Sequence, residues 1–453
     1  TRHSPLRYIL TRSIYRSMST NKVVISKAPS VAVGPSEQLV GAGDTILLSS
    51  YDKLFVRTVT AGTVFLVFEH PIHDPVETIK TGLSRALTHY HPISGRLAPA
   101  ADGGGFVIKC SGEGVSFVAA SASCAMKDVR SKLSDPSMKD ELAIYYPTNS
   151  GDSYSEPLLL MQVTVFSCGG FVVGVTWDHA VSDGLGLAQF LQAVGEMARG
   201  APSPSVVPAR TSDALALEAP PPFYADFMRF MTRSLQPCPM AFLSIAVPSS
   251  LTTRIQQDYS RRYRGRRCSA FDVVAAVLWR CRTRATMPEP EALSVIVYAE
   301  NMRRHAGARD GYYGNCLTAR PVISTSGTVA SMDVVELLEM VRREKERAPD
   351  RSDMDRLRTG KLDGYNLLRV SSWRGIGLDA TDFGRGKPAR VMGNWRDRTS
   401  LPLCASLPCK DDYNVISMFV REEHVRAFRR ELATMIQILY DDPLVSGSVS
   451  SRL

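Results

Sequence analysis

The chain has 453 residues, of which 44% are hydrophobic and 22% charged, with 32 glycines and 27 prolines. This is the composition of a globular protein, and it excludes collagen-like, disordered and coiled-coil proteins. The length exceeds what one hydrophobic core normally serves, so it predicts more than one structural unit. No run approaches the roughly 18 uninterrupted apolar residues of a membrane span, so we expect a soluble protein.

The formal net charge of +9 would fit a partner such as nucleic acid or a membrane surface. Its distribution weakens that interpretation, because residues 1–17 hold four arginines and no acidic residue. We interpret residues 1–17 as a leader or a remnant of upstream sequence, ahead of the more conventional start at Met18. The rest of the chain has an ordinary charge balance, and we predict no nucleic-acid partner for it.

The nine cysteines are scattered along the chain, and no C-x-x-C pair occurs. Disulfide frameworks and zinc sites both require cysteines at short, regular spacing. We therefore predict no metal site, and reduced, mostly structural cysteines in an intracellular protein. The sequence also has none of the motifs typical of phosphate-binding loops, zinc proteases or serine hydrolases.

In chain order, the first half alternates β-rich segments with amphipathic ones. The spacing of Ile79, Leu83 and Leu87 predicts a helix over 76–88. A second helix is predicted from the end of the loop 179–184 to about Arg199. One predicted strand is 63–69. Strands 106–109 and 115–119 are predicted to form a short hairpin, and strands 158–166 and 171–177 a stronger one.

Residues 200–222 are rich in proline, serine and alanine and show no helical period, so we predict a linker. It divides the chain into an N-terminal domain, residues 18–199, and a C-terminal domain, residues 223–453. Mixed helices, strands and hairpins in both halves predict α/β domains with mixed sheets. In the second half, helices are predicted near 270–284, 332–347 and 422–439, and strands near 293–298 and 415–420.

The segment HAVSDG, residues 179–184, is the main candidate for chemistry, although H-x-x-x-D alone is a weak pattern. A second match, His70 to Asp74, also stands between a predicted strand and a predicted helix. There a proline follows, which is typical of a helix start, so Asp74 is interpreted as a helix cap. Asp183 is followed instead by Gly184 and Gly186, which let the backbone turn sharply and approach other segments closely.

His179 is a candidate general base. A neutral imidazole near pH 7 can remove a proton from an alcohol or amine that attacks an acyl carbon, and can return it to a leaving thiolate. Asp183 either orients His179 or binds an arginine and fixes the loop, and its position across a bend favours the second role. If neither residue takes part in catalysis, His179 is a structural histidine and Asp183 caps the helix that follows.

Several further segments accompany HAVSDG in a fixed order. They are a Q-x-T-x-F-x-C-G-G-F hairpin at 162–171, YHPISGRL at 90–97, an S-x-F-D helix start at 269–272, Asn301 with Arg303, and GYYGN at 311–315. Together these motifs resemble the plant BAHD acyl-CoA-dependent acyltransferases, from about residue 25 to residue 440. The match as a set is far more specific than H-x-x-x-D alone.

The resemblance implies two domains of chloramphenicol-acetyltransferase-like topology, joined by a crossover loop at 200–222, with a channel between them. His179 would stand in this channel, between a CoA thioester and the acceptor. Asp183 would pair with Arg303, and Gly184 would serve the turn that follows. Ser371, in Ser371-Ser372-Trp373, would help to bind the oxyanion, and Trp373 would line the acceptor pocket or belong to the core.

The family's second signature, D-F-G-W-G, corresponds to residues 382–386, with Arg385 in place of the tryptophan. In the family this segment is structural, which implies structural roles for Asp382, Gly384 and Gly386. A large buried aromatic residue is worth about 3–5 kcal/mol, and a buried unpaired guanidinium would cost more. We therefore expect Arg385 to impair stability or activity.

Five arginines lie among residues 261–267, just before Ser269. Guanidinium groups suit phosphates, because each offers two parallel hydrogen bonds. In the family the S-x-F region lies near the CoA entrance, which implies Arg266, Arg267 and Ser269 as contacts of CoA. The alternative is an ordinary solvated run of charge.

Together, the residues and the resemblance predict a monomeric acyltransferase. It would move an acyl group of hydroxycinnamoyl or benzoyl type from a CoA thioester to an alcohol or amine of a plant specialised metabolite. Acyl-CoA is then a co-substrate, and no cofactor is bound permanently. The alternatives are a condensation-domain-like enzyme and a catalytically weak paralogue that binds a metabolite or a protein. We expect a cytoplasmic protein, or a peroxisomal one if Ser451-Arg452-Leu453 acts as an S-K-L address.

Overall fold

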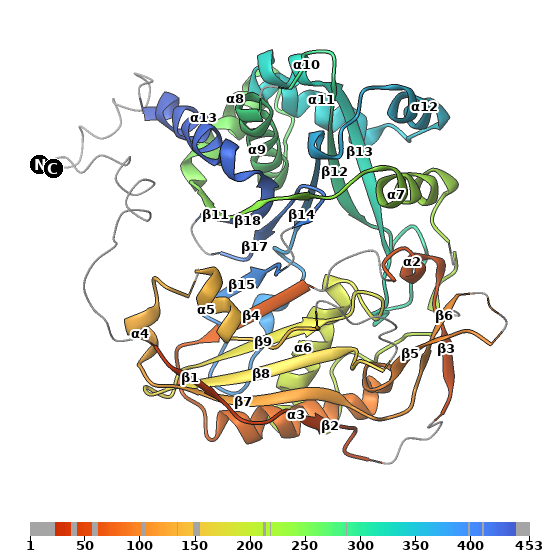
Figure 1. Ribbon diagram of the computed structural model, residues 1–453, viewed down its shortest axis with the longest axis vertical. Coiled ribbons are helices and arrows are strands. Elements are labelled where there is room, and N and C mark those ends of the chain that lie inside the picture. Colours follow the sequence, from red (N-terminus) through yellow and green to blue (C-terminus); the bar gives the residue numbers. More distant parts are fainter. Residues whose placement is uncertain are drawn as a thin grey trace, which may run out of the picture.

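Two bodies, each built on one large sheet, make up the molecule (Figure 1). The computed structural model describes residues 23–37, 43–56, 62–101, 103, 105–133, 135–147, 155–211, 214–217, 219–286, 288–396, 399–409 and 412–440. The predicted leader, residues 1–17, and the C-terminal Ser451-Arg452-Leu453 lie outside the described residues. No helix in the described part of the chain is long and apolar enough to cross a membrane.

The first body is a seven-stranded mixed sheet in the order β1-β7-β8-β9-β4-β15, with β2 also paired to β7. Its strands are β1 (Ile25–Lys27), β2 (Val31–Val33), β4 (Gly62–Phe68), β7 (Val115–Ala122), β8 (Leu159–Phe166), β9 (Phe171–Trp177) and β15 (Arg390–Asn394). Two packed helices, α3 (Pro75–His89) and α6 (Gly184–Ala198), cover one face. The predicted helices at 76–88 and after 184 and the predicted hairpin 158–166/171–177 are thereby confirmed.

One predicted hairpin is wrong. β6 (Phe106–Lys109) pairs with β3 (Thr45–Leu47) and β5 (Arg96–Pro99) in a small separate sheet, while β7 joins the large sheet. Gly112 and Gly114 adopt positive φ angles of 69° and 89° in the connection, and these redirect the chain. A Cβ on Gly114 would lie 2.4 Å from the carbonyl oxygen of Val33, so the connection packs against β2 instead of folding back.

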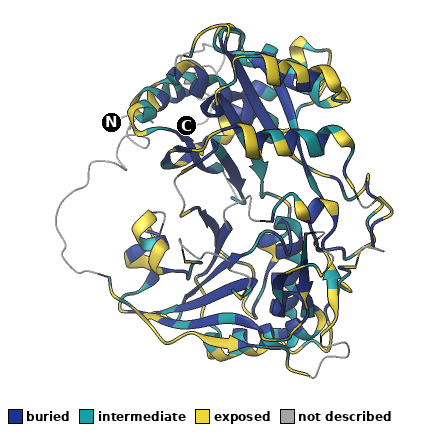
Figure 2. Cartoon of the chain, turned by 45° about the vertical axis from the view of Figure 1, so that its right-hand side comes forward, coloured by how far each residue is buried: buried dark blue, intermediate teal, exposed yellow. Residues whose placement is uncertain are grey.

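The second body is a six-stranded sheet in the order β11-β18-β17-β14-β12-β13. Helices cover both faces, α8, α9, α11 and α13 on one side and α7 and α12 on the other, so the strands are the most deeply buried part (Figure 2). The strands are β11 (Ala241–Val247), β12 (Leu293–Asn301), β13 (Leu317–Thr325), β14 (Leu367–Ser372), β17 (Leu403–Leu407) and β18 (Tyr413–Val420). The helices are α7 (Pro222–Ser234), α8 (Ser249–Arg262), α9 (Ala270–Thr286), α11 (Val334–Glu346), α12 (Arg351–Thr359) and α13 (Glu422–Tyr440).

The chain passes between the two bodies more than once. Residues 200–222 connect α6 of the first body to α7 of the second. Strand β15, although it follows residue 223, pairs antiparallel with β4 in the first body, as Figure 1 shows for the blue strand among the warm colours. A division of the sequence at one linker therefore does not separate the two sheets completely.

Candidate active site

His179 stands directly after β9, at the junction of the two bodies. β9 is buried along its whole length and pairs with both β8 and β4, so the backbone that carries His179 is held on both sides. The imidazole is half-buried. The ring of Phe55 stacks on it at 4.3 Å and 9°, and the ring of Trp177 lies 6.3 Å away.

The side chain of Asn315 determines which ring nitrogen of His179 carries the proton. Its Nδ2 donates to the carbonyl oxygen of His179 at 2.7 Å and to Oδ1 of Asp52 at 3.0 Å. Both partners only accept, so the amide orientation is fixed and its Oδ1 faces Nδ1 of His179 at 3.0 Å. Nδ1 must therefore be the donor, which leaves the lone pair of neutral His179 on Nε2.

Burial lowers the pKa of His179 from its ordinary value of 6.5. A hydrogen bond of the ring to its own backbone, the carboxylates of Asp183 and Asp178, and the bond to Asn315 oppose this shift. Because the net shift is downward, the ring is neutral at pH 7 and able to accept a proton.

Asp183 binds an arginine, the arrangement that its position across a bend favoured. It is 1% exposed and accepts two hydrogen bonds from Arg303, at 2.8 and 2.9 Å, so the predicted pairing is present. Its Oδ1 also caps α6 by accepting from the backbone of Leu185 and Gly186, and its Oδ2 accepts from the backbone of Cys316. With its acceptor sites occupied in this way, Asp183 fixes the loop.

The glycines after Asp183 allow α6 to approach the GYYGN segment. A Cβ on Gly186 would lie 1.9 Å from the carbonyl oxygen of Tyr313, which no side chain can tolerate. Gly184 opens α6, where a Cβ would meet Ile376 at 3.2 Å, a contact that a small shift relieves. The close approach therefore requires glycine at 186 more strictly than at 184.

Sequence reasoning missed three residues of this site: Asp52, Arg210 and Asn315. Asp52 is fully buried, and Arg210, from the predicted linker, is 5% exposed and lies 3.2 Å from its carboxylate. The only signals were indirect. Asn315 ends the GYYGN match, Ser49 and Asp52 form a capping box that predicts only a helix start, and nothing around Arg210 marks it.

The ring of Trp177 lies between those of Trp373 and His179. Trp373 follows β14, and its ring is 6.4 Å from that of Trp177 and 6.3 Å from that of Trp395. It is half-buried and packs against the cores of both bodies, so it lies between these cores and the His179 site. Ser371 is half-buried two residues earlier on β14.

The DFGRG segment lies at the C-terminal end of α6, where Arg199 donates to the carbonyl oxygen of Asp382. Oδ1 of Asp382 accepts from the backbone of Gly384 and Gly386, at 2.7 and 2.9 Å, and both glycines have positive φ, 126° and 94°. Phe383 is buried against Phe68 and Phe171. Arg385 is exposed, so the cost of burying an unpaired guanidinium does not arise at this position.

Arg266, Arg267 and Ser269 lie on the exposed turn between α8 and α9, in the helical layer of the second body. Arg266 faces Glu339 at 3.5 Å, and Ser269 accepts from the backbone of Asp272 at the start of α9. Others of the arginine run, Arg261 and Arg262, pair with carboxylates of α8 and α11. Much of this charge is therefore neutralised within the second body.

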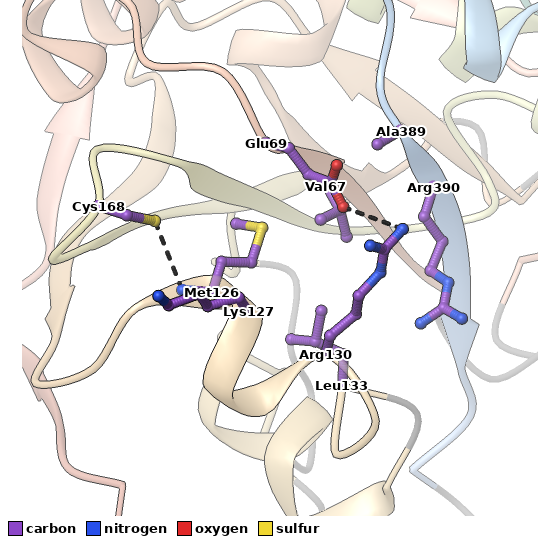
Figure 3. Close-up of a pocket in the computed structure, with 9 residues that line it drawn as sticks. All are labelled: Val67, Glu69, Met126, Lys127, Arg130, Leu133, Cys168, Ala389 and Arg390. Atoms are coloured by element: carbon purple, nitrogen blue, oxygen red, sulfur yellow. Dashed lines mark hydrogen bonds and ion pairs between the residues drawn. The ribbon is translucent and has the colours of Figure 1, made fainter.

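A cavity of about 260 Å³ opens in the first body, at the ends of β4 and β15 (Figure 3). Arg130 pairs with Glu69 there at 3.3 Å, and the thiol of Cys168 accepts from the backbone of Met126. The lining residues are Val67, Glu69, Met126, Lys127, Arg130, Leu133, Cys168, Ala389 and Arg390. None of the residues predicted for acyl transfer is among them, so this cavity is separate from the His179 site.

Comparison with known proteins places the site in a family. The family model described as "Transferase family" matches residues 24–435. The chain belongs to this family, the BAHD acyl-CoA-dependent acyltransferases that its motifs resemble.

Two plant relatives match this BAHD chain over most of its length. Acyl transferase 15 of Oryza sativa subsp. japonica is 44% identical over 435 residues, 91% of this chain and 99% of the relative. Myricetin 3-O-glucosyl 1,2-rhamnoside 6'-O-caffeoyltransferase AT2 of Crocosmia x crocosmiiflora is 30% identical, over 90% of this chain and 98% of the relative. The BAHD assignment therefore extends across both bodies.

Solved structures confirm the predicted fold class. Vinorine synthase has a TM-score of 0.70 and 19% identity, covering 91% of this chain and 98% of that one. TRI101 of F. graminearum, solved with ethyl coenzyme A, has a TM-score of 0.66 and 17% identity, covering 85% and 96%. This BAHD chain thus has the two-domain, chloramphenicol-acetyltransferase-like α/β fold.

Proposed function

We propose that this acyltransferase uses Nε2 of His179 as the general base that transfers an acyl group from a CoA thioester to a hydroxyl or amine. The observation that carries the proposal is the set of hydrogen bonds around Asn315, which leaves the lone pair of His179 on Nε2. Burial lowers the pKa of His179, so that lone pair is free at neutral pH.

The proposed reaction has two steps. The acceptor oxygen or nitrogen attacks the thioester carbonyl carbon while its proton passes to Nε2 of His179, which gives a tetrahedral oxyanion. The C–S bond then breaks, the ester or amide is released, and the imidazolium returns the proton to the CoA thiolate. Asn315 accepts from Nδ1 throughout, and the hydroxyl of Ser371 is the proposed donor to the oxyanion.

The proposed donor is an aromatic acyl-CoA of hydroxycinnamoyl or benzoyl type. The rings of Phe55 and Trp177 lie against His179, and Trp373 lies beyond Trp177, so the surroundings of the base suit a flat acyl group. The similarity to a caffeoyltransferase supports the same class. Arg266, Arg267 and Ser269 remain proposed CoA contacts. Arg266 faces Glu339, whereas Arg267 forms no ion pair with a carboxylate of the described residues.

The alternatives have lost support. The weak-paralogue alternative depended on Arg385, which is exposed and capable of solvation. A condensation-domain-like enzyme would usually have a second histidine before the first, and Asp178 stands there. We propose a monomer that acts in the cytoplasm. A fluorescent protein fused to the N-terminus would test the peroxisomal alternative, because it leaves Ser451-Arg452-Leu453 free.

The proposal is tested by mass spectrometry of purified protein incubated with acyl-CoA donors and small alcohols and amines. The panel sets hydroxycinnamoyl- and benzoyl-CoA against acetyl- and malonyl-CoA. We expect acylated acceptor and free CoA in equal amounts, with the aromatic donors preferred, and a rate of product formation about 10²–10⁴ times lower with His179→Ala. Turnover by His179→Ala at the wild-type rate would refute the assigned base. A preference for acetyl- or malonyl-CoA would refute only the donor class.

A further inference from the structure

The predicted linker touches the His179 site directly. Ala209 forms backbone hydrogen bonds with Gly311 and Tyr313, at 2.9 and 3.1 Å, in the GYYGN segment. The next residue, Arg210, extends into the junction of the two bodies, where α2 (Ser50–Lys53) also lies (Figure 1). A loop that only connects two domains does not bury a guanidinium there, because burying a charge is costly unless it is paired.

Arg210 holds the backbone immediately after His179. Its Nε donates to the carbonyl oxygen of Val181 at 3.2 Å, and its Nη2 to that of Ala180 at 3.4 Å. Its Nη1 lies 3.2 Å from Oδ2 of Asp52. One side chain thus binds the histidine loop and a buried carboxylate together.

Asp52 connects that pair to Asn315. Its Oδ1 accepts from both the backbone N–H and the side-chain Nδ2 of Asn315, each at 3.0 Å. Its Oδ2 accepts from the backbone and hydroxyl of Ser49, at 2.9 and 2.8 Å. The Asn315 amide in turn accepts from Nδ1 of His179, so a hydrogen-bonded path runs from the Asp52 carboxylate to the imidazole.

We propose that Asp52 and Arg210 are positioning residues of the acyl-transfer site, and that the balance of their two opposite charges sets the pH at which His179 takes up a proton. The inference rests on the proposed function only in that His179 is the base. The Asp52 carboxylate favours the imidazolium through Asn315, whereas the Arg210 guanidinium, which binds the adjacent loop, opposes it. Neither residue touches a reacting atom.

Other ionisable groups face this network. Asp183 and Arg303 neutralise each other, and burial raises the pKa of Cys316 to about 12, so its thiol is neutral at pH 7. Burial also raises the pKa values of the two neighbouring tyrosines, which keeps them neutral, and raises that of Asp178. The groups around His179, Asp52 and Arg210 are Asp178, Asp183, Arg303, Tyr312, Tyr313 and Cys316.

The test is a charge cycle with two readouts. The ring nitrogens of ¹⁵N-labelled histidine, with the His179 signal assigned from His179→Gln, give its protonation pH without any substrate. The acidic limb of kcat/KM gives the same quantity during turnover. We expect Asp52→Asn to lower the protonation pH by about one unit and Arg210→Met to raise it by about one unit, because each leaves the opposite charge unbalanced. The double variant should return close to the wild-type value.

Two further variants separate charge from geometry. Arg210→Lys keeps the charge but not the fork of donors, so kcat should fall while the protonation pH stays. Arg210→Gln removes the charge but keeps a donor for a loop carbonyl, and it replaces Arg210→Met if that variant does not fold. The matched control is the ion pair of Arg347 with the buried Asp353, 2.7 Å apart at α12 of the second body. Asp353→Asn should affect stability and leave the His179 protonation pH unchanged.

Folded single variants that shift the protonation pH in the same direction, or not at all, would overturn the proposal. If Arg210→Met and Arg210→Gln are both unfolded, Asp52→Asn decides alone, and the absence of a downward shift overturns the proposal. A shift of the NMR signal that the kinetic limb does not follow would instead refute His179 as the base. The two failures are therefore distinguishable.

Discussion

The two H-x-x-x-D segments, 70–74 and 179–183, share a pattern and a structural setting but differ in burial and in the residues that they contact. Each follows a strand of the same sheet, β4 or β9, and these two strands pair with each other. Each precedes one of the two packed helices, α3 or α6. Yet His70 is exposed and Asp74 caps α3 at a φ of 33°, whereas Asp183 is buried and His179 lies among aromatic rings.

The difference comes from the second body. The connection between β12 and β13 brings Arg303 to Asp183 and Asn315 to His179, from positions 120 and 136 residues further along the chain. Because β4 and β9 are antiparallel, the segment at 70–74 lies at the opposite end of this strand pair from His179, where α3 starts. A short motif therefore obtains its chemistry from distant residues, and each of the following variants tests one part of that contrast.

The largest expected effect separates the two histidines. His179→Ala should lower kcat by about 10²–10⁴, the usual contribution of a general base, while His70→Ala should leave it unchanged. Steady-state kinetics on both variants makes the comparison. Equal activities would show that the two segments do not differ in chemistry.

The two aspartates should differ in stability. Asp183→Asn leaves Arg303 without its charged partner in a largely buried site, which should lower the free energy of unfolding by about 3–5 kcal/mol. Asp74→Ala removes one helix cap and should lower it by about 1 kcal/mol. Chemical denaturation measures both, and a smaller loss for Asp183→Asn than for Asp74→Ala would contradict the structural role of Asp183.

The pH dependence of activity should report the burial of His179. Burial disfavours the imidazolium and lowers the pKa of His179 below 6.5, so the base stays unprotonated as the pH falls to that value. The acidic limb of kcat/KM in the wild type should therefore lie below pH 6.5. A limb above this value would mean that the surrounding carboxylates outweigh burial.

The smallest effect is expected at Arg385. Because its side chain is exposed, Arg385→Trp should change the free energy of unfolding by less than about 0.5 kcal/mol and leave kcat unaltered. Thermal melting and the standard assay are sufficient. A gain of several kcal/mol would restore the idea that a buried aromatic residue is missing there.

Sequence reasoning succeeded where local pattern and fold agree. The helices at α3, α6 and α9 and the hairpin of β8 and β9 followed from apolar spacing and from turn or cap residues. The prediction of a hairpin at 106–109 and 115–119 was wrong. A connection that contains glycines indicates that the chain changes direction, but it does not indicate which strand the chain then pairs with. Strand β15 was not among the predicted strands, and local pattern does not reveal its pairing with β4, which lies more than 300 residues earlier along the chain.

The properties of this protein divide in the same way between sequence and tertiary structure. The sequence by itself determined a globular α/β chain and its family, and it singled out His179 as the candidate base, because these are carried by composition, local periodicity and a set of short motifs. Only the tertiary structure decided that Arg210 belongs to the site, that Arg385 is exposed, and that Asn315 selects the nitrogen of His179. The reason is physical: burial, pairing of charges and the orientation of a hydrogen bond depend on segments that meet only when the two bodies fold together.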